Sequence, residues 1–221
     1  MSRTWVVVPV FNEASIVGDV VRDLVAEFGF VVCVDDGSSD GSAQVARAAG
    51  AHVVTHPINL GQGASLQTGF DYALLDPAMT EVVTFDADGQ HQISDAREMV
   101  ERLRTEDLAI VTGSRFLDKR TQLSFLKRVT LRTAARVSRI TTGKSLTDSH
   151  NGLRVLRRDA LEAVRITQNR MAHASELVDL LAATGLPWSE HPTHIVYTDY
   201  SRSKGQSLLN GVNILVDLLI R

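Results

Sequence analysis

The sequence reads Glu81-Val82-Val83-Thr84-Phe85-Asp86-Ala87-Asp88-Gly89-Gln90-His91 where an apolar, strand-like run leads directly into two carboxylates. Carboxylates two residues apart at a strand end offer the hard oxygen ligands that Mg²⁺ and Mn²⁺ prefer. An Asp-x-Asp pair is also common in ordinary turns and helix caps. The surrounding sequence therefore decides whether Asp86 and Asp88 form a metal site.

Strand and helix patterns alternate on both sides of this pair. Apolar runs predict strands at residues 5–8, 30–34, 52–55, 81–85, 108–112 and 193–197. Helical periodicity predicts helices at residues 14–28, from about 39, 63–75 and 94–103. The alternation predicts an α/β fold with a mostly parallel central sheet flanked by helices, which binds ligands at the carboxyl ends of its strands.

Length and composition favour a single catalytic domain over residues 1–221, because the chain is 44% hydrophobic and of single-domain size. The net charge of −3 gives no basic field for nucleic acid. Cys33 is the only cysteine and lies in an apolar run, so we expect a buried strand thiol, no disulfide within the chain and a reducing, cytoplasmic location. No secretory signal and no stretch of about 20 apolar residues is present, and residues 206–221 have the spacing of an amphipathic helix.

Each predicted strand of the first half ends in a polar turn, and every one of these turns except the first contains glycine. The turn after the first strand lacks the GxGxxG pattern of dinucleotide-binding folds, and no GxxxxGK[ST] phosphate loop is present. Nicotinamide-dependent and P-loop chemistry are therefore disfavoured.

Five of these turns, in their order, resemble the signature of family 2 glycosyltransferases. They are Pro9-Val10-Phe11-Asn12-Glu13, Asp35-Asp36-Gly37-Ser38-Ser39-Asp40-Gly41, Asn59-Leu60-Gly61-Gln62-Gly63, Asp86-Ala87-Asp88 and Gly113-Ser114-Arg115-Phe116. Two later patterns resemble the branch of dolichol-phosphate mannose synthases and polyprenyl-phosphate sugar transferases, namely Asp148-x-x-x-Gly152-x-Arg154 and Arg202-x-x-Gly205-x-Ser207. The resemblance implies the nucleotide-diphospho-sugar transferase fold of GT-A type, a divalent metal ion and inversion at the anomeric carbon.

The resemblance also assigns roles to residues of this chain. Those implied to bind the nucleotide sugar are Pro9, Asn12, Glu13, Asp36, Asp40, Gly61, Gln62, Gly63, Asp86 and Ala87. Those implied to bind Mg²⁺ or Mn²⁺ are Asp86, Asp88 and Gln90, and those implied to bind an acceptor phosphate are Arg115, Arg128, Arg202 and Lys204. Many relatives carry lysine where Gln62 stands, so the metal or Arg115 must supply that positive charge.

The chemistry of the acceptor leaves alternatives open. A phosphate acceptor is largely dianionic at neutral pH and can attack without an enzymic base, whereas a glycan hydroxyl needs one. The candidate bases are Asp148 and Glu176, which with Asp86, Asp88 and Arg115 complete the predicted catalytic set. A third interpretation is a non-catalytic subunit that binds nucleotide sugars.

We expect the chain to move a sugar from a UDP- or GDP-linked donor to a polyprenyl phosphate. Arginines recur at helical spacing over residues 128–139, which suits either a solvated helix face or an anionic membrane surface. The expectation is thus a cytoplasmic protein able to lie on the inner face of the membrane. Since the sequence contains no membrane-spanning stretch, we also hypothesise a separate membrane partner.

Overall fold

The computed structural model describes residues 3–118, 146–148, 151–170 and 172–196. Strands and helices alternate up to the fifth strand, as the sequence predicts. The strands are β1 Arg3–Val10, β2 Phe30–Asp35, β3 His52–Thr55, β4 Met79–Thr84, β5 Ile110–Ser114, β6 Arg154–Arg157 and β7 Trp188–Pro192. The helices are α1 Val17–Phe28, α2 Ser42–Ala48, α3 Gln62–Leu74, α4 Ile93–Thr105, α6 Arg158–Glu162 and α7 His173–Ala183.

The strands form one seven-stranded sheet in the order β3-β2-β1-β4-β6-β5-β7. Strand β1 pairs in parallel with β2 and β4, as do β2 with β3 and β5 with β7. Strand β6 is antiparallel to both of its neighbours, with Val155 opposite Val83 of β4 and Val111 of β5. The mostly parallel α/β sheet is confirmed, and it contains one antiparallel strand that the sequence does not predict.

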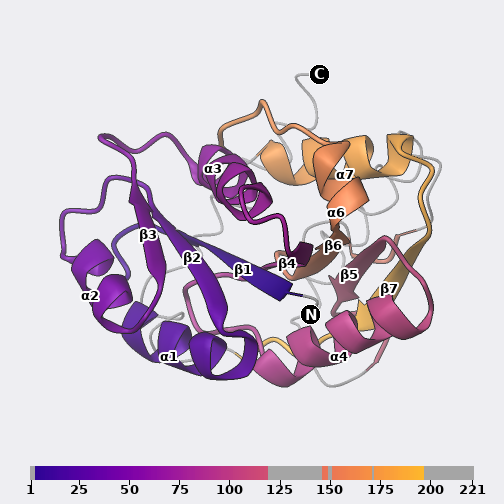
Figure 1. The fold of residues 1–221 in the computed structure, drawn as a ribbon, viewed down its shortest axis with the longest axis horizontal. Helices are drawn as coiled ribbons and strands as arrows, with labels where there is room; N and C mark the ends of the chain where they lie inside the picture. The colour runs from indigo at the N-terminus through magenta and orange to yellow at the C-terminus, as the bar shows by residue number, and fades with distance from the viewer. Residues whose placement is uncertain (1–2, 119–145, 149–150, 171, 197–221) are drawn as a thin grey trace.

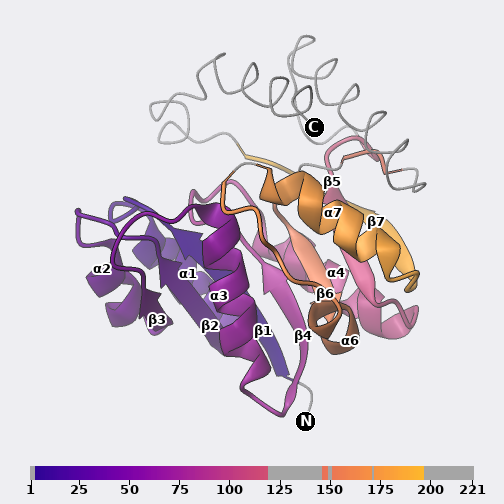
Figure 2. The same cartoon turned by 90° about the horizontal axis from the view of Figure 1, so that it is seen from above.

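Helices cover both faces of the sheet, with α1, α2 and α4 on one face and α3, α6 and α7 on the other (Figures 1 and 2). Side chains of β1 alternate between the two resulting cores, so that Val6 and Val8 face α1 while Trp5 and Val7 face α3. Coverage of both faces explains why the predicted strands are continuous apolar runs.

Cys33 lies fully buried in β2, in the core beneath α1. Burial, with the nearby charge of Asp35, raises the pKa of the Cys33 thiol to about 12. The prediction of a buried strand thiol is confirmed.

Two predicted element boundaries differ from the structure for local physical reasons. The strand predicted at 193–197 is wrong for its described part, because β7 covers Trp188–Pro192 and pairs with β5 only as far as Ser114 opposite Pro192. The helix predicted from about residue 39 begins at Ser42. Gly41 has a φ of 89°, and the carboxylate of Asp40 accepts the Ser42 N–H at 3.0 Å.

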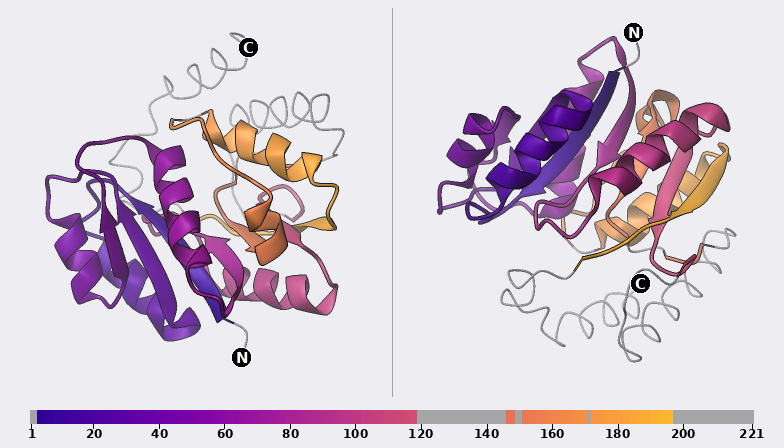
Figure 3. Two further views of the ribbon diagram at one scale, coloured as in Figure 1. Left: turned by 45° about the horizontal axis from the view of Figure 1, so that its top comes forward. Right: turned by 90° about the horizontal axis from the view of Figure 1, so that it is seen from below.

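The segment between α6 and α7 runs beside α3, where the N–H of Ile166 donates to the Gln67 side chain at 2.7 Å (Figure 3). The helix predicted at 206–221 and the arginines of 128–139 lie outside the described residues. Within the described ranges, no helix has the length and apolar character needed to cross a membrane.

Candidate active site

A cavity of about 490 Å³ lies where the carboxyl ends of β1, β2 and β4 meet. It is lined by Pro9, Val10, Phe11, Glu13, Asp36, Asn59, Gly61, Gln62, Ser65, Asp86, Ala87, Asp88 and Arg170. The structure thus brings together eight residues that the sequence predicts for the site: Pro9, Glu13, Asp36, Gly61, Gln62, Asp86, Ala87 and Asp88.

Asp86 and Asp88 follow β4 and face this cavity. The Asp86 carboxylate contacts His91 Nε2 at 2.9 Å and accepts a hydrogen bond from Gln62 at 3.2 Å. Enclosure works to raise the pKa of Asp86, but the hydrogen bond and charge of His91, with the charge of Arg154, hold that pKa below its ordinary value. Burial, and next the charge of Asp86, raise the pKa of Asp88 to about 6.

This pair of carboxylates fits a divalent cation in ligand type. Carboxylate oxygens suit Mg²⁺ and Mn²⁺, which commonly take their remaining ligands from water and substrate phosphates. In the described part of the chain, no cluster of three or more His, Cys, Asp or Glu residues forms a fuller metal site. Gln90 meets Asp88 through its backbone N–H at 3.0 Å, and its side chain stays a predicted ligand.

Gly152 packs directly against the Asp86 carboxylate. A Cβ atom at position 152 would overlap Asp86 Oδ2, so no other residue type fits there without moving that carboxylate. The Gly152 carbonyl accepts a hydrogen bond from Thr84 at 2.6 Å, which ties it to β4. Arg154, two residues further, is buried, and its charge acts on both Asp86 and Asp148. The motif in the sequence contains Gly152 and Arg154 but gives no role for either.

The loops after β1 and β2 are fastened to each other. Asn12 has a left-handed φ of 54°, and its N–H donates to the Ser38 hydroxyl at 2.9 Å. The Glu13 N–H donates to the Ser42 hydroxyl at 2.8 Å, and this hydroxyl donates to Asp40 at 2.5 Å. Asn12 and Asp40 therefore shape the loops beside the cavity without lining it.

Asp36 uses its carboxylate to fix the turn before α3. It contacts His56 Nδ1 at 2.8 Å and accepts the N–H groups of Leu60 at 2.9 Å and Gly61 at 2.7 Å. Burial works to raise its pKa, but these hydrogen bonds hold it below the ordinary value. His56 is itself buried and reaches Thr68 of α3 at 3.0 Å, a role that sequence reasoning missed.

The segment before α7 closes against the same turn. The Gly63 N–H donates to the Asn169 carbonyl at 2.9 Å, and a Cβ at Gly61, whose φ is 108°, would overlap that carbonyl. Glu176 of α7 holds the segment by accepting the N–H groups of Thr167 at 3.0 Å and Gln168 at 2.8 Å. Glu176 is thus engaged with backbone, and it does not line the cavity.

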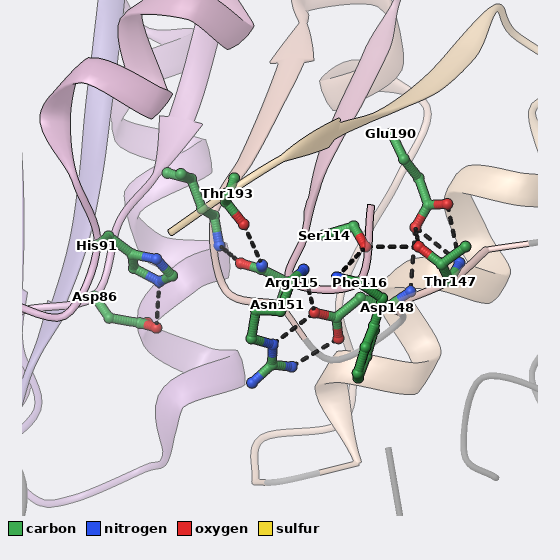
Figure 4. A network of polar contacts seen from close by, with 11 residues as sticks. Asp86, His91, Ser114, Arg115, Phe116, Thr147, Asp148, Asn151, Glu190 and Thr193 are labelled. Carbon is green, nitrogen blue, oxygen red and sulfur yellow. Dashed lines mark hydrogen bonds and ion pairs between the residues drawn. The ribbon is translucent and has the colours of Figure 1, made fainter. Parts of the chain in front are cut away.

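Arg115 and Asp148 are paired with each other. Figure 4 shows the Arg115 side chain facing the Asp148 carboxylate, with two N–H···O contacts of 2.6 Å. Glu190 of β7 accepts the N–H of Thr147 at 2.9 Å and of Asp148 at 3.1 Å, and burial raises the pKa of Glu190. The predicted cation and the predicted base therefore belong to one partly buried network that does not line the cavity. The other predicted acceptor-phosphate residues, Arg128, Arg202 and Lys204, lie outside the described residues.

Comparison with known proteins places this architecture in a family. The model of glycosyl transferase family 2 matches residues 5–165. An uncharacterised protein of Methanocaldococcus jannaschii is 33% identical, over 98% of this chain and 91% of its own length. A UDP-N-acetylglucosamine–dolichyl-phosphate N-acetylglucosaminyltransferase of Methanococcus voltae is 25% identical, over 98% of this chain and 94% of its own. An undecaprenyl-phosphate 4-deoxy-4-formamido-L-arabinose transferase of Sodalis glossinidius is 31% identical, over 99% of this chain and 67% of its own.

Solved structures agree on the fold. Glucosyl-3-phosphoglycerate synthase from Mycobacterium tuberculosis, crystallised with Mg²⁺ and uridine diphosphate, superimposes with a TM-score of 0.70 at 18% identity. The match covers 98% of this chain and 79% of that one. The sheet and its flanking helices thus have the GT-A fold predicted from the sequence. The chain belongs to glycosyl transferase family 2 and is a glycosyltransferase.

Proposed function

We propose that this enzyme transfers one sugar, with inversion, from a UDP- or GDP-linked donor to a polyprenyl phosphate, using Mg²⁺ or Mn²⁺. The observation that carries the proposal is the cavity in which Asp86 and Asp88 meet the turns after β1 and β2. The relatives named for dolichyl-phosphate and undecaprenyl-phosphate substrates support this class of acceptor.

The residues of the cavity have separate roles in this reaction. Asp86 and Asp88 would hold the metal ion, which would supply Lewis-acid stabilisation to the departing nucleoside diphosphate. His91 contacts Asp86 Oδ2, and Gly152 leaves the space that this carboxylate occupies. Asp36 keeps the turn at Gly61 in place, so that the donor meets a preformed surface.

A phosphate acceptor fits the state of the candidate bases better than a hydroxyl acceptor does. Asp148 is bound to Arg115 and Glu176 to backbone N–H groups, and neither lines the cavity. A phosphate dianion needs no base, but it needs cations to bind it. We assign that binding to Arg115 together with Arg128, Arg202 and Lys204, and a separate membrane partner that delivers the lipid stays a prediction.

The test incubates the enzyme with radiolabelled UDP- or GDP-sugars, undecaprenyl phosphate and Mn²⁺ or Mg²⁺, and measures label in the organic phase. We expect labelled lipid of inverted anomeric configuration. EDTA, Asp86→Asn and Asp88→Asn should each lower the rate by about 100-fold or more, since each removes charge stabilisation of the leaving group.

Asp107→Asn is the matched control, because Asp107 is 97% exposed and far from the cavity in sequence and fold. Its rate should equal that of the wild type. Label that enters a glycan hydroxyl and not the lipid would replace the proposal with the hydroxyl-acceptor alternative. Nucleotide binding without any turnover would favour the non-catalytic subunit.

A further inference from the structure

Arg170 is the one basic side chain among the described residues that line the cavity. The other charged residues of the lining are acidic: Glu13, Asp36, Asp86 and Asp88. A nucleoside diphosphate brings negative charge into this acidic surface, so the cavity needs positive charge beyond that of one metal ion. Arginine is well suited to phosphate, because its guanidinium can donate two parallel hydrogen bonds.

The local structure holds Arg170 at the cavity through its backbone. Its carbonyl accepts the His173 N–H at 2.9 Å and contacts His173 Nδ1 at 2.7 Å. Glu176 and the contact between Asn169 and Gly63 fix the residues just before it. These contacts involve the main chain of Arg170, so they persist when its side chain is replaced.

The aliphatic part of the Arg170 side chain lies against the turn at Gly61, which precedes α3. Its Cγ atom lies 3.3 Å from the point where a Cβ of Gly61 would stand. The side chain is exposed, and among the described residues no acid forms an ion pair with it. The guanidinium is thus available to a ligand.

We propose that Arg170 binds the diphosphate of the nucleotide-sugar donor. Gln62, the first residue of α3, is uncharged and donates to Asp86 at 3.2 Å. Arg170 supplies positive charge to the same turn from the segment before α7. This inference rests on the proposed function, because it names a ligand contact within the same site.

The donor and the acceptor both carry phosphate, and the position of Arg170 selects the donor. Arg170 lies against the Gly61 turn, in one cavity with Asp86, Asp88 and Asp36. The network of Arg115 and Asp148, which we assign to the acceptor side, does not line this cavity. A contact to the donor diphosphate therefore follows from the placement.

The experiment compares binding of UDP, UMP, GDP and GMP by calorimetry with Mn²⁺ present. Arg170→Ala should weaken binding of the preferred nucleoside diphosphate by about 10- to 100-fold, as for a lost hydrogen bond to a charged group. The corresponding monophosphate should change by about threefold or less. Arg170→Lys should recover part of the lost affinity, since lysine restores the positive charge but cannot donate two parallel hydrogen bonds.

Arg165→Ala is the matched control, because Arg165 is exposed on the same segment and does not line the cavity. Its affinities should equal those of the wild type. If Arg170→Ala and the wild type bound the diphosphate equally well, the inference would be overturned and the proposed function would stand. The same conclusion would follow if Arg170→Ala raised only the KM for the lipid acceptor. A wild type that binds neither UDP nor GDP would overturn both.

Discussion

Gly152 and the Asp86 carboxylate occupy adjacent space, with no room for a Cβ between them. We expect Gly152→Ala to displace Asp86 and to lower kcat/KM by about 100-fold, because misplacement of a reacting group by about 1 Å has effects of this size. The affinity for Mn²⁺ should fall as well. Steady-state kinetics and metal titration, with circular dichroism to verify folding, measure the effect.

Gly18→Ala provides the control for this substitution. A Cβ at Gly18 would lie 2.9 Å from Val45 Cγ1, which is a milder crowding between α1 and α2, at residues that do not line the cavity. It should reduce stability and leave metal affinity unchanged. If both variants lost activity in proportion to lost stability, the contact with Asp86 would not explain the requirement for glycine.

Single residues of the site differ in how far sequence could predict them. Asp86, Asp88 and Asp36 follow strands, and the rule that ligands bind at strand ends places them correctly. Arg170 follows no strand and reaches the cavity only because Glu176 and Gly63 fix its segment. The contact of His56 with Asp36 is equally non-local, so the residues between them give no signal of it.

At the scale of elements, α7 positions the segment that closes the cavity. We expect Glu176→Gln to raise the KM for the donor by about 5- to 10-fold, because the amide replaces one of the two oxygens that accept N–H groups. The shape of the pH profile of kcat should stay unchanged. Donor titrations across a range of pH values provide both readouts.

If Glu176 were a general base, the same substitution would have a different effect. Glu176→Gln would then lower kcat by about 100-fold or more and remove the acidic limb of the pH profile of kcat. Glu162→Gln serves as the control, since Glu162 of α6 is exposed and pairs only with Arg158 among the contacts described. Its kinetics should match those of the wild type.

Helix α4 is tied to β1 and β4 through a buried acid. Glu81 accepts a hydrogen bond from Thr4 at 2.6 Å and pairs with Arg104, whose side chain is 43% exposed. Arg104→Met should lower the free energy of unfolding by about 2 kcal/mol, less than for a fully buried pair because water reaches the arginine. Urea denaturation measures this change.

Arg97→Met tests whether the effect belongs to the buried acid. Arg97 lies on the same helix, and its pair with Glu27 is long, at 3.9 Å, and 53% exposed on the arginine side. The expected change in the free energy of unfolding is below about 1 kcal/mol. Equal losses in the two variants would contradict the role given to Glu81.

The elements of the first half follow from local pattern, whereas β6 and β7 do not. Strands β1 and β2 contain long apolar runs because helices cover both faces of the sheet. Strand β7 reads Trp-Ser-Glu-His-Pro, and its polar residues are partly exposed beside β5. The position of such a strand depends on its pairing with β5 and not on its own apolar pattern. The strand predicted from the sequence, at 193–197, therefore lies a few residues too late.

For the whole molecule, alternation of strands and helices predicts the class of fold and the parallel half of the sheet. It does not predict that β6, late in the sequence, separates β4 from β5. That arrangement depends on pairing between residues about 70 positions apart, such as Val83 and Val155. No window of local sequence contains this information.

The position of β6 has a consequence for synthesis on the ribosome. A nascent chain that has emerged as far as Ser114 holds β4 and β5 without the strand that joins them, so Val82 and Val83 border an open sheet edge. Open apolar edges recruit foreign strands and favour aggregation. Residues 154–157 must therefore emerge before β6 can cover the edges of β4 and β5, and until then the nascent chain is most prone to aggregate.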